Sequence, residues 1–153
     1  MKEINPDYVK TVIGLANACP FFRLLSMSIR ELSRSRALLD AELSQKHLQA
    51  FGFVHGGVFA SIIDTAAYWA AHFHLEEDMG VTSVDLKVNY LAPAVAGRIA
   101  ARGVMIKMGR TLGLGEAEIT DQAGRILAHG TSTLMVVPGY SLAGNPELPP
   151  KFK

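Results

Sequence analysis

Apolar residues recur along the chain with two different periods, one typical of helices and one typical of strands. From residue 6 to about 18 they recur every three or four positions, which predicts an amphipathic helix. Asn5 and Pro6 stand at its start, where Asn is a favoured N-cap and Pro a favoured first helical residue. From Gly56 to about Leu75 a second helical segment is apolar on nearly every side, and we expect such a helix to be buried on every side.

Alternation of polar and apolar residues, typical of strands, fills most of the rest. It is cleanest in residues 83–90. The apolar phase slips inside residues 111–120, which predicts a β-bulge there. Two strands joined near Arg34 and Ser35 are predicted between residues 26 and 44, and later strands over residues 98–108, 111–120 and 125–137.

The predicted order of elements is helix, two strands, buried helix, four strands. A single antiparallel sheet that curls around the buried helix explains why that helix has no polar face, and it predicts an α+β fold. We expect residues 1–137 to form this one domain. Residues 138–153 carry several Gly and Pro residues, so we expect them to lie extended on the surface or to be disordered.

Composition excludes several classes of protein. The 153 residues include 15 Lys and Arg against 14 Asp and Glu, and this balance argues against a coat for nucleic acid or for an anionic membrane. With a single cysteine, Cys19, the chain cannot form an internal disulfide, and a cysteine-based zinc site is not expected. Because 49% of the residues are hydrophobic and 19% charged, we expect another subunit to cover part of the surface.

The sequence also argues against export and membrane insertion. Residues 1–11 are charged and lack the apolar core of a signal peptide. The most apolar stretch, residues 54–73, contains His55, Asp64 and His72, which makes it a poor membrane span. We therefore expect a soluble cytoplasmic protein.

Candidate chemistry is concentrated in sixteen residues, from Gln49 to Asp64. Gly56 and Gly57 stand where the buried helix begins, and the free N–H groups of a helix N-terminus suit an oxyanion or a polarised carbonyl. Gln49 and His55 can supply side-chain hydrogen bonds there. Asp64 is a single carboxylate within an apolar helix, where it needs a partner or a role such as general base or nucleophile.

Each of these features also has a plainer explanation. A His-Gly-Gly sequence is more often a turn than a site, and hydrogen bonds to backbone groups explain Asp64 alone equally well. Their combination is more specific than either part. Asp64 lies eight residues after Gly56, about 12 Å along a helix at roughly 1.5 Å per residue, so one helix cannot bring both to one carbonyl. Two antiparallel copies of the helix can do so, which predicts a site shared across a dimer.

Two further clusters are less specific. His72 and His74 precede three acidic residues, yet residues two apart do not share a helix face, so we favour a solvated helix end over a metal site. Lys107 and Arg110 lie in a basic turn that is equally well explained as a phosphate contact or as a solvated hairpin tip.

Three segments resemble the hotdog-fold acyl-CoA thioesterases, most closely the phenylacetate-pathway type within the 4-hydroxybenzoyl-CoA thioesterase superfamily. They read GFVHGGVFASIIDTAAYWAA, GVTSVDLKVNYLAPA and KMGRTLGLGEAEITDQAGRILAHGTSTLMVV. The resemblance covers about residues 26–137, and its most specific element is His-Gly-Gly with an acid nine residues after the His. It implies a curved antiparallel sheet around one long helix, assembled as homodimers and often as homotetramers.

The resemblance also implies roles for the candidate residues. The N–H of Gly56 would polarise the thioester carbonyl, and Asp64 of the facing subunit would act as general base or as nucleophile. His55 would help to orient the thioester. Ser83, with Thr82 as the alternative, would place a hydroxyl near the attacking water. The phosphates of coenzyme A would meet Arg110 and Lys107.

Gln49 departs from the resemblance, because many members of the phenylacetate type carry Asn there. Gln occurs in other branches, usually beside a catalytic Glu. The combination of Gln49 with Asp64 therefore does not identify the acyl group of the substrate. Gln and Asn both carry an amide, so the departure does not argue against hydrolysis. Aromatic residues on or near the buried helix are consistent with aryl or medium-chain acyl groups, although core packing explains them more simply. These residues are Phe59, Tyr68, Trp69 and Phe73.

The sequence therefore predicts an acyl-CoA thioesterase that needs no metal or other cofactor. One alternative is a hotdog dehydratase or hydratase acting on acyl thioesters, which the His-Gly-Gly sequence disfavours. The other is a non-catalytic acyl-CoA-binding module, which Asp64 disfavours because a binding pocket gains nothing from a buried acid beside a thioester.

Overall fold

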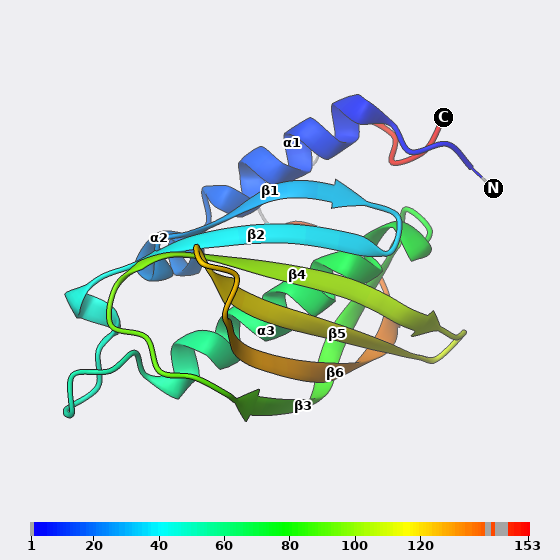
Figure 1. Ribbon diagram of the computed structural model, residues 1–153. Helices are drawn as coiled ribbons and strands as arrows, with labels where there is room; N and C mark the ends of the chain where they lie inside the picture. The colour runs from blue at the N-terminus through cyan, green and yellow to red at the C-terminus, as the bar shows by residue number, and fades with distance from the viewer. Residues whose placement is uncertain (1, 140–141, 143–146) are drawn as a thin grey trace.

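The computed structural model describes residues 2–139, 142 and 147–153 of the chain (Figure 1). Two short 3-10 helices, η1 and η2, flank the long helix α3. The elements are α1 Pro6–Asn17, α2 Pro20–Leu25, β1 Met27–Ser33, β2 Arg36–Leu43, η1 Gln45–His47, α3 Gly56–Ala71, η2 His72–His74, β3 Met79–Tyr90, β4 Gly97–Met108, β5 Leu112–Asp121 and β6 Ile126–Pro138.

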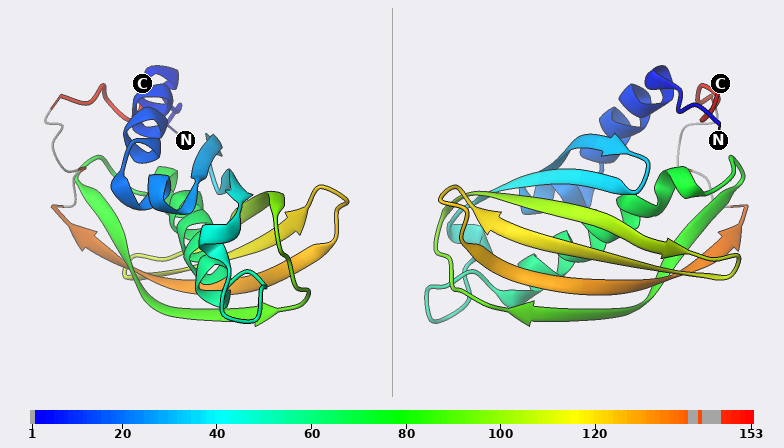
Figure 2. Two further views of the ribbon diagram at one scale, coloured as in Figure 1. Left: turned by 90° about the vertical axis from the view of Figure 1, so that its left-hand side faces the viewer. Right: turned by 45° about the vertical axis from the view of Figure 1, so that its right-hand side comes forward.

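The strands form one antiparallel sheet in the order β1-β2-β4-β5-β6-β3. The sheet curves around α3, while α1 and α2 lie beside β1 at one edge of the molecule (Figures 1 and 2). A curved antiparallel sheet wrapped around one long helix is the hotdog fold. The α+β class predicted from the order of elements is confirmed.

Small residues on the sheet let α3 lie very close to it. A Cβ atom at Gly103 of β4 would lie 2.1 Å from the carbonyl oxygen of Ala66, and one at Gly115 of β5 would lie 3.2 Å from the Cβ of Ala67. Because closely packed interiors have no room for a contact of 2.1 Å to backbone, a larger residue at Gly103 would push the helix off the sheet, whereas one at Gly115 would need a shift of only a few tenths of an ångström.

The strand β5 alternates regularly, so the bulge predicted within residues 111–120 is wrong. Gly113 and Gly115 are buried while the neighbouring leucines are exposed, and glycine at the inward positions produces the apparent slip of the apolar phase. The register shifts instead lie in the neighbouring strands, with Ile106 as the extra residue of β4 and Leu127 as that of β6.

A bulge interrupts β3 at the place where the sequence alternates most cleanly. The pairing of β3 with β6 shifts between Ser83 and Asp85, so Val84 is the extra residue. An extra residue reverses which side chains face the helix beyond it. Ser83 therefore faces α3, as Leu86 does, whereas Asp85 faces the solvent side.

One face of α3 is only half-buried in the single chain, which contradicts the expected burial on every side. This half-exposed stripe recurs every three or four residues and consists of Ser61, Asp64, Thr65 and Tyr68. The other faces pack against the sheet and contain the buried Ile62, Ile63, Ala66 and Ala67. Within the described residues, no helix combines the length and apolar character that a membrane crossing requires.

The two ends of the chain lie together at the C-terminal end of α3. The Asn5 side chain accepts the N–H of Asp7 at 3.1 Å, which confirms the predicted start of α1. Ile4 and Phe152 form an antiparallel bridge, and Lys151 between these segments and η2 is only 2% exposed. Of the tail predicted over residues 138–153, residues 140, 141 and 143–146 lie outside the described residues.

Candidate active site

Two serine hydroxyls hold the Asp64 carboxylate on the half-exposed stripe of α3. Ser83 of β3 donates to Oδ1 of Asp64 at 2.7 Å, and Ser132 of β6 donates to the same oxygen at 3.1 Å. Among the described residues, the other carboxylate oxygen, Oδ2, has no hydrogen-bond partner. The carboxylate is therefore anchored through one oxygen and presents the other, as a general base or a nucleophile requires.

A free backbone donor lies at the N-terminus of α3. His55 is the N-cap, and its Nδ1 accepts the N–H of Gly57 at 2.8 Å. Since Nδ1 accepts, a neutral imidazole carries its proton on Nε2 and can donate from there. Within the described part of the chain, the N–H of Gly56 has no acceptor. It is therefore available to donate to a ligand at the helix N-terminus, where the helix dipole is positive.

The ring of Tyr90 lies directly over Gly56. A Cβ atom at Gly56 would lie 3.0 Å from both Cε1 and Cζ of that ring. A side chain at this position would therefore displace the aromatic ring by a few tenths of an ångström. Tyr90 is exposed at the end of β3, so it forms one wall of the approach to the Gly56 N–H.

Gln49 closes the loop that precedes α3. Its Oε1 accepts the N–H of Phe51, and its backbone N–H donates to the carbonyl oxygen of Phe53 at 2.8 Å. Gly52 takes the positive φ of 84° that this tight loop requires. The two amide hydrogens of the Gln49 side chain remain donors, consistent with the predicted hydrogen-bonding role.

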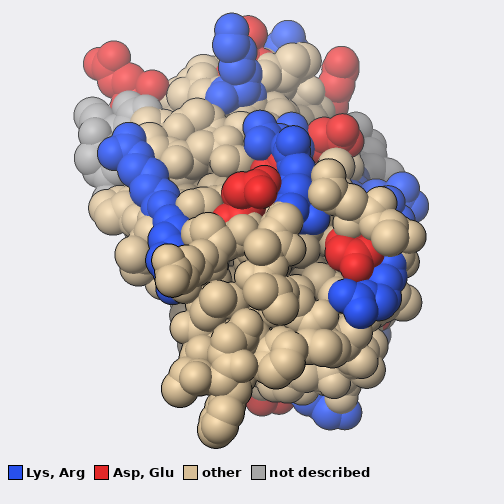
Figure 3. All heavy atoms as spheres, turned by 60° about the vertical axis from the view of Figure 1, so that its left-hand side comes forward, with Lys and Arg blue, Asp and Glu red and all other residues tan. Residues whose placement is uncertain are grey.

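Two hollows flank the start of α3. One of about 430 Å³ is lined mainly by Phe53, Phe59, Tyr90 and Leu91 and includes Gly56. The other, of about 410 Å³, is lined by Phe21, Leu24 and Val58 together with His55 and Ser61. Charged side chains gather in the upper part of this side of the molecule, and the lower part is almost free of charge (Figure 3). A larger hollow of about 600 Å³, between β1, β2 and β4, includes none of the predicted site residues.

Several predicted site residues lie apart from both Asp64 and Gly56 in the single chain. Lys107 and Arg110 are exposed at the β4–β5 turn, at the opposite end of the sheet from Gly56 (Figure 1). Thr82 lies on the opposite face of β3 from Ser83, because neighbouring strand residues point to opposite faces. Tyr68 lies on the half-exposed stripe one turn beyond Asp64.

The other aromatic residues considered for an acyl pocket mostly pack in the core. Trp69 and Phe73 are 7% and 1% exposed, so core packing accounts for both. Phe59 is also buried, although its side chain lines the 430 Å³ hollow beside Gly56. The tertiary structure therefore leaves Phe59 and Tyr68 as the two that reach a surface near the candidate site.

Sequence reasoning missed two residues of this cluster, Ser132 and Tyr90. Ser132 stands between two threonines in β6, and only the pairing of β6 with β3 turns its side chain toward Asp64. Tyr90 ends β3, and the loop that follows returns it to the start of α3, as the bond from the Val54 N–H to the carbonyl oxygen of Ala94 shows. Both residues reach the site through long-range contacts that no local pattern encodes.

The C-terminal end of α3 carries a buried polar cluster instead of the predicted solvated end. Nε2 of His72 lies 2.9 Å from the Tyr8 hydroxyl, and burial, reinforced by the positive charge of Lys151, lowers the pKa of His72 to about 3. Burial, followed by the negative charge of Glu77, raises the pKa of Tyr8 to about 12. The prediction of a solvated helix end is therefore wrong for His72, whose ring is held between α1 and the core.

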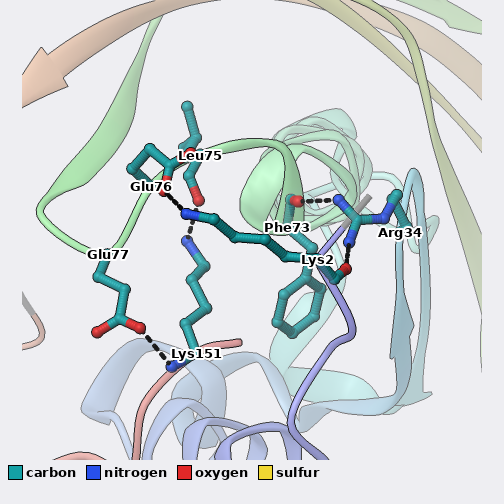
Figure 4. Close-up of polar contacts among 7 residues, drawn as sticks. All are labelled: Lys2, Arg34, Phe73, Leu75, Glu76, Glu77 and Lys151. Atoms are coloured by element: carbon teal, nitrogen blue, oxygen red, sulfur yellow. Dashed lines mark hydrogen bonds and ion pairs between the residues drawn. The ribbon is translucent and has the colours of Figure 1, made fainter. Parts of the chain in front are cut away.

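Lys151 completes this buried cluster from the C-terminal segment (Figure 4). Its ammonium donates to the carbonyl oxygen of Leu75 at 3.1 Å, and its backbone N–H donates to Glu77 at 3.2 Å. Burial lowers the pKa of Lys151 to about 8, although the negative charges of Glu77 and Glu76 oppose that shift. At the surface of the cluster Lys2 pairs with Glu76 at 2.6 Å.

The curved sheet, the acid on its central helix and the open helix start together define a hotdog-fold thioesterase. The chain belongs to the thioesterase superfamily, whose sequence profile matches residues 51–128, and it is a thioester hydrolase. It is 29% identical to a 1,4-dihydroxy-2-naphthoyl-CoA hydrolase of Listeria monocytogenes, over 73% of this chain and 91% of that protein. It is 26% identical to acyl-coenzyme A thioesterase 13 of Homo sapiens, over 87% of this chain and 96% of the human one.

A solved structure supports the same fold. The thioesterase HI1161 of Haemophilus influenzae superposes with a TM-score of 0.81, covering 94% of this chain and 99% of that one. The two sequences are 22% identical, so this likeness concerns the fold alone.

Proposed function

We propose that this enzyme is an acyl-CoA thioesterase, which hydrolyses an aryl- or medium-chain acyl-CoA to the free acid and coenzyme A without a metal or other cofactor. The observation that carries the proposal is the Asp64 carboxylate, anchored through Oδ1 and unpartnered at Oδ2 among the described residues. The acyl-CoA substrates in the names of two relatives support the choice of thioester.

In the proposed reaction Asp64 activates water against a polarised carbonyl. The N–H of Gly56 donates to the thioester carbonyl oxygen and stabilises the negative charge that develops there. Asp64 takes a proton from water, the water oxygen bonds to the carbonyl carbon, and the C–S bond breaks to release coenzyme A as the thiolate. Alternatively the carboxylate attacks the carbonyl carbon itself, the C–S bond breaks to release coenzyme A as the thiolate, and water then hydrolyses the resulting mixed anhydride to the free acid and the Asp64 carboxylate.

The Gly56 and Asp64 of one site are proposed to come from two subunits. In a single helix the two are about 12 Å apart at roughly 1.5 Å per residue, too far for one carbonyl. The half-exposed stripe on α3 and the unpaired edge of β3, where Val84 is 52% exposed, support burial of this face by a second copy. A dimer of dimers is the proposed larger assembly.

The remaining predicted residues have supporting roles in this proposal. The His55 Nε2–H and the Gln49 amide are donors beside the thioester, and the apolar hollow lined by Phe53, Phe59 and Tyr90 receives the acyl group. The exposed Arg110, with Lys107, binds coenzyme A phosphates as charge-assisted donors.

Release of free thiol from a panel of acyl-CoAs tests the proposed reaction. We expect thiol release with aryl or medium-chain substrates and a value of kcat/KM that ranks the acyl groups. Hydration of a 2-enoyl-CoA without thiol release, or binding without turnover, would contradict hydrolysis.

Subunit mixing tests the shared site. Asp64→Asn and a second variant carrying Gln49→Ala with Gly56→Pro should each be nearly inactive, once each is shown to fold and dimerise. Random pairing makes about half of the refolded dimers mixed, and each mixed dimer regains one intact site, so about a quarter of wild-type activity should return. Mixed dimers with no recovery would place both groups in one chain.

A further inference from the structure

We propose that Ser132 is a positioning residue for hydrolysis: together with Ser83 it fixes the Asp64 carboxylate so that Oδ2 is the oxygen that reacts. This inference rests on the function proposed above, in which Asp64 is the base or nucleophile. It assigns a role to a residue that has no catalytic pattern around it in the sequence.

The two hydroxyls meet Asp64 from neighbouring strands of the sheet. Ser132 of β6 and Ser83 of β3 both donate to Oδ1, at 3.1 and 2.7 Å, and β6 pairs with β3 from Ala128 to Pro138. Two donors from two strands fix the plane of the carboxylate as well as its position. Because both act on Oδ1, only Oδ2 keeps its lone pairs for a proton or for the carbonyl carbon.

The two serines differ in their exposure to water. In the single chain Ser83 is exposed, so water can replace its hydrogen bond to Asp64, whereas Ser132 is completely buried (0% exposed) within its own chain. A buried hydroxyl also costs free energy unless it finds an acceptor, and the acceptor that Ser132 finds is the carboxylate. Ser132 is therefore the permanent anchor of the pair.

Packing alone does not call for a hydroxyl at this position. The other inward residues of β6 around it are Ala128, Gly130 and Leu134, all apolar or without a side chain. Alanine would fill nearly the same space as serine without burying a polar atom. The hydroxyl is thus explained by its hydrogen bond to Asp64, since a bond donated to a charged carboxylate is stronger than one between neutral groups.

The test compares Ser132→Ala with a matched variant on the same strand, Thr131→Val, which removes a hydroxyl from the opposite face of β6. For Ser132→Ala we expect kcat to fall about tenfold, the effect of losing one hydrogen bond to a charged group, with KM changed less than about twofold. Ser132→Thr, which keeps the hydroxyl, should restore kcat. Thr131→Val should match the wild type in all of these measurements.

A second background shows whether Ser132 acts through Asp64. When Ser132→Ala is added to Asp64→Asn, the residual rate should not fall further, because the group that Ser132 positions is already gone. If Ser132→Ala does not fold, Ser132→Cys keeps the size but is a weaker donor and serves for the same measurements.

The possible failures are distinguishable. If Ser132→Ala keeps the wild-type kcat while Asp64→Asn is inactive, Ser132 is only a core residue and the proposed function stands. A lower melting temperature with an unchanged kcat would likewise make its role purely structural. If Asp64→Asn itself remains active, the proposed function fails, and the assignment of Ser132 fails with it.

Discussion

The polar groups at the two ends of α3 differ: at the N-terminal, open end several have no partner among the described residues, whereas at the C-terminal, closed end they are paired. At the N-terminal end two hollows flank the helix start, and among the described residues the Gly56 N–H and the Gln49 amide hydrogens keep unused hydrogen-bonding capacity. At the C-terminal end the chain termini close over the helix, and His72 and Lys151 are paired with a hydroxyl and a carbonyl oxygen. Unused donors beside a hollow can bind a substrate, whereas mutually paired groups in the interior can only contribute to stability.

The same contrast applies to charge. The closed end holds an ammonium whose pKa burial lowers to about 8 and an imidazole whose pKa burial lowers to about 3, so burial there disfavours the charged form of both groups. Midway along α3 the Asp64 carboxylate stays half-exposed and receives two hydroxyl donors. Substitutions at the open end and at Asp64 should therefore change activity with little effect on stability, and substitutions at the closed end should do the reverse.

The largest effect is expected from Asp64→Asn, midway along α3. Asn keeps an oxygen that can accept from Ser83 and Ser132 but cannot take a proton from water, so kcat should fall by roughly 10²- to 10⁴-fold. The melting temperature should stay near that of the wild type. Steady-state kinetics and thermal unfolding on the same preparation check both, and more than about a tenth of the wild-type kcat would remove Asp64 from the mechanism.

At the closed end Lys151 should make stability depend on pH. Its pKa is about 8 in the folded chain and ordinarily 10.5, so the unfolded chain binds more protons between these values and stability rises with pH across that range. Lys151→Met lacks this titration. Relative to this variant, the free energy of unfolding of the wild type should increase by at most about 1.4 kcal/mol per pH unit above pH 8.

Urea unfolding between pH 7 and 9.5 measures this difference below the range in which Tyr8 titrates. Lys153→Met, which removes an exposed lysine two residues away, is the control and should show the same pH dependence as the wild type. Thioester hydrolysis should be unchanged in both variants. If the free energy of unfolding depends on pH in the same way for Lys151→Met and the wild type, burial does not lower the pKa of Lys151 in the folded chain.

Local sequence patterns predicted most of the fold and part of the site. The periods of apolar residues locate the strands and both long helices, because burial on one face leaves a regular signal in the chain. The pattern missed α2, whose apolar residues are too few to show a period, and it placed Ser83 with Asp85 because a bulge leaves no mark in the alternation.

Other features depend on packing between distant segments. Glycine at inward positions of β5 imitates a slip of phase, and only the nearby α3 backbone explains it. His72 resembles a solvated residue until α1 and Lys151 cover it. The dipeptide Gly56-Gly57 and Asp64 signal chemistry locally, whereas Ser132 and Tyr90 join them only because β6 and β3 fold back over the helix start and middle.

The smallest effect is expected at Arg110, which belongs to neither end of α3 in the single chain. A phosphate contact remote from the thioester binds the ground state and the transition state alike, so Arg110→Ala should raise KM by about threefold to tenfold and leave kcat nearly unchanged. The effect should shrink as salt screens the exposed charges. Arg102→Ala, which removes an exposed arginine from β4, controls for the loss of one positive charge. If KM for acyl-CoA at low ionic strength does not differ between the Arg110 and Arg102 variants, Arg110 is a solvated hairpin residue, and the coenzyme A phosphates are bound elsewhere.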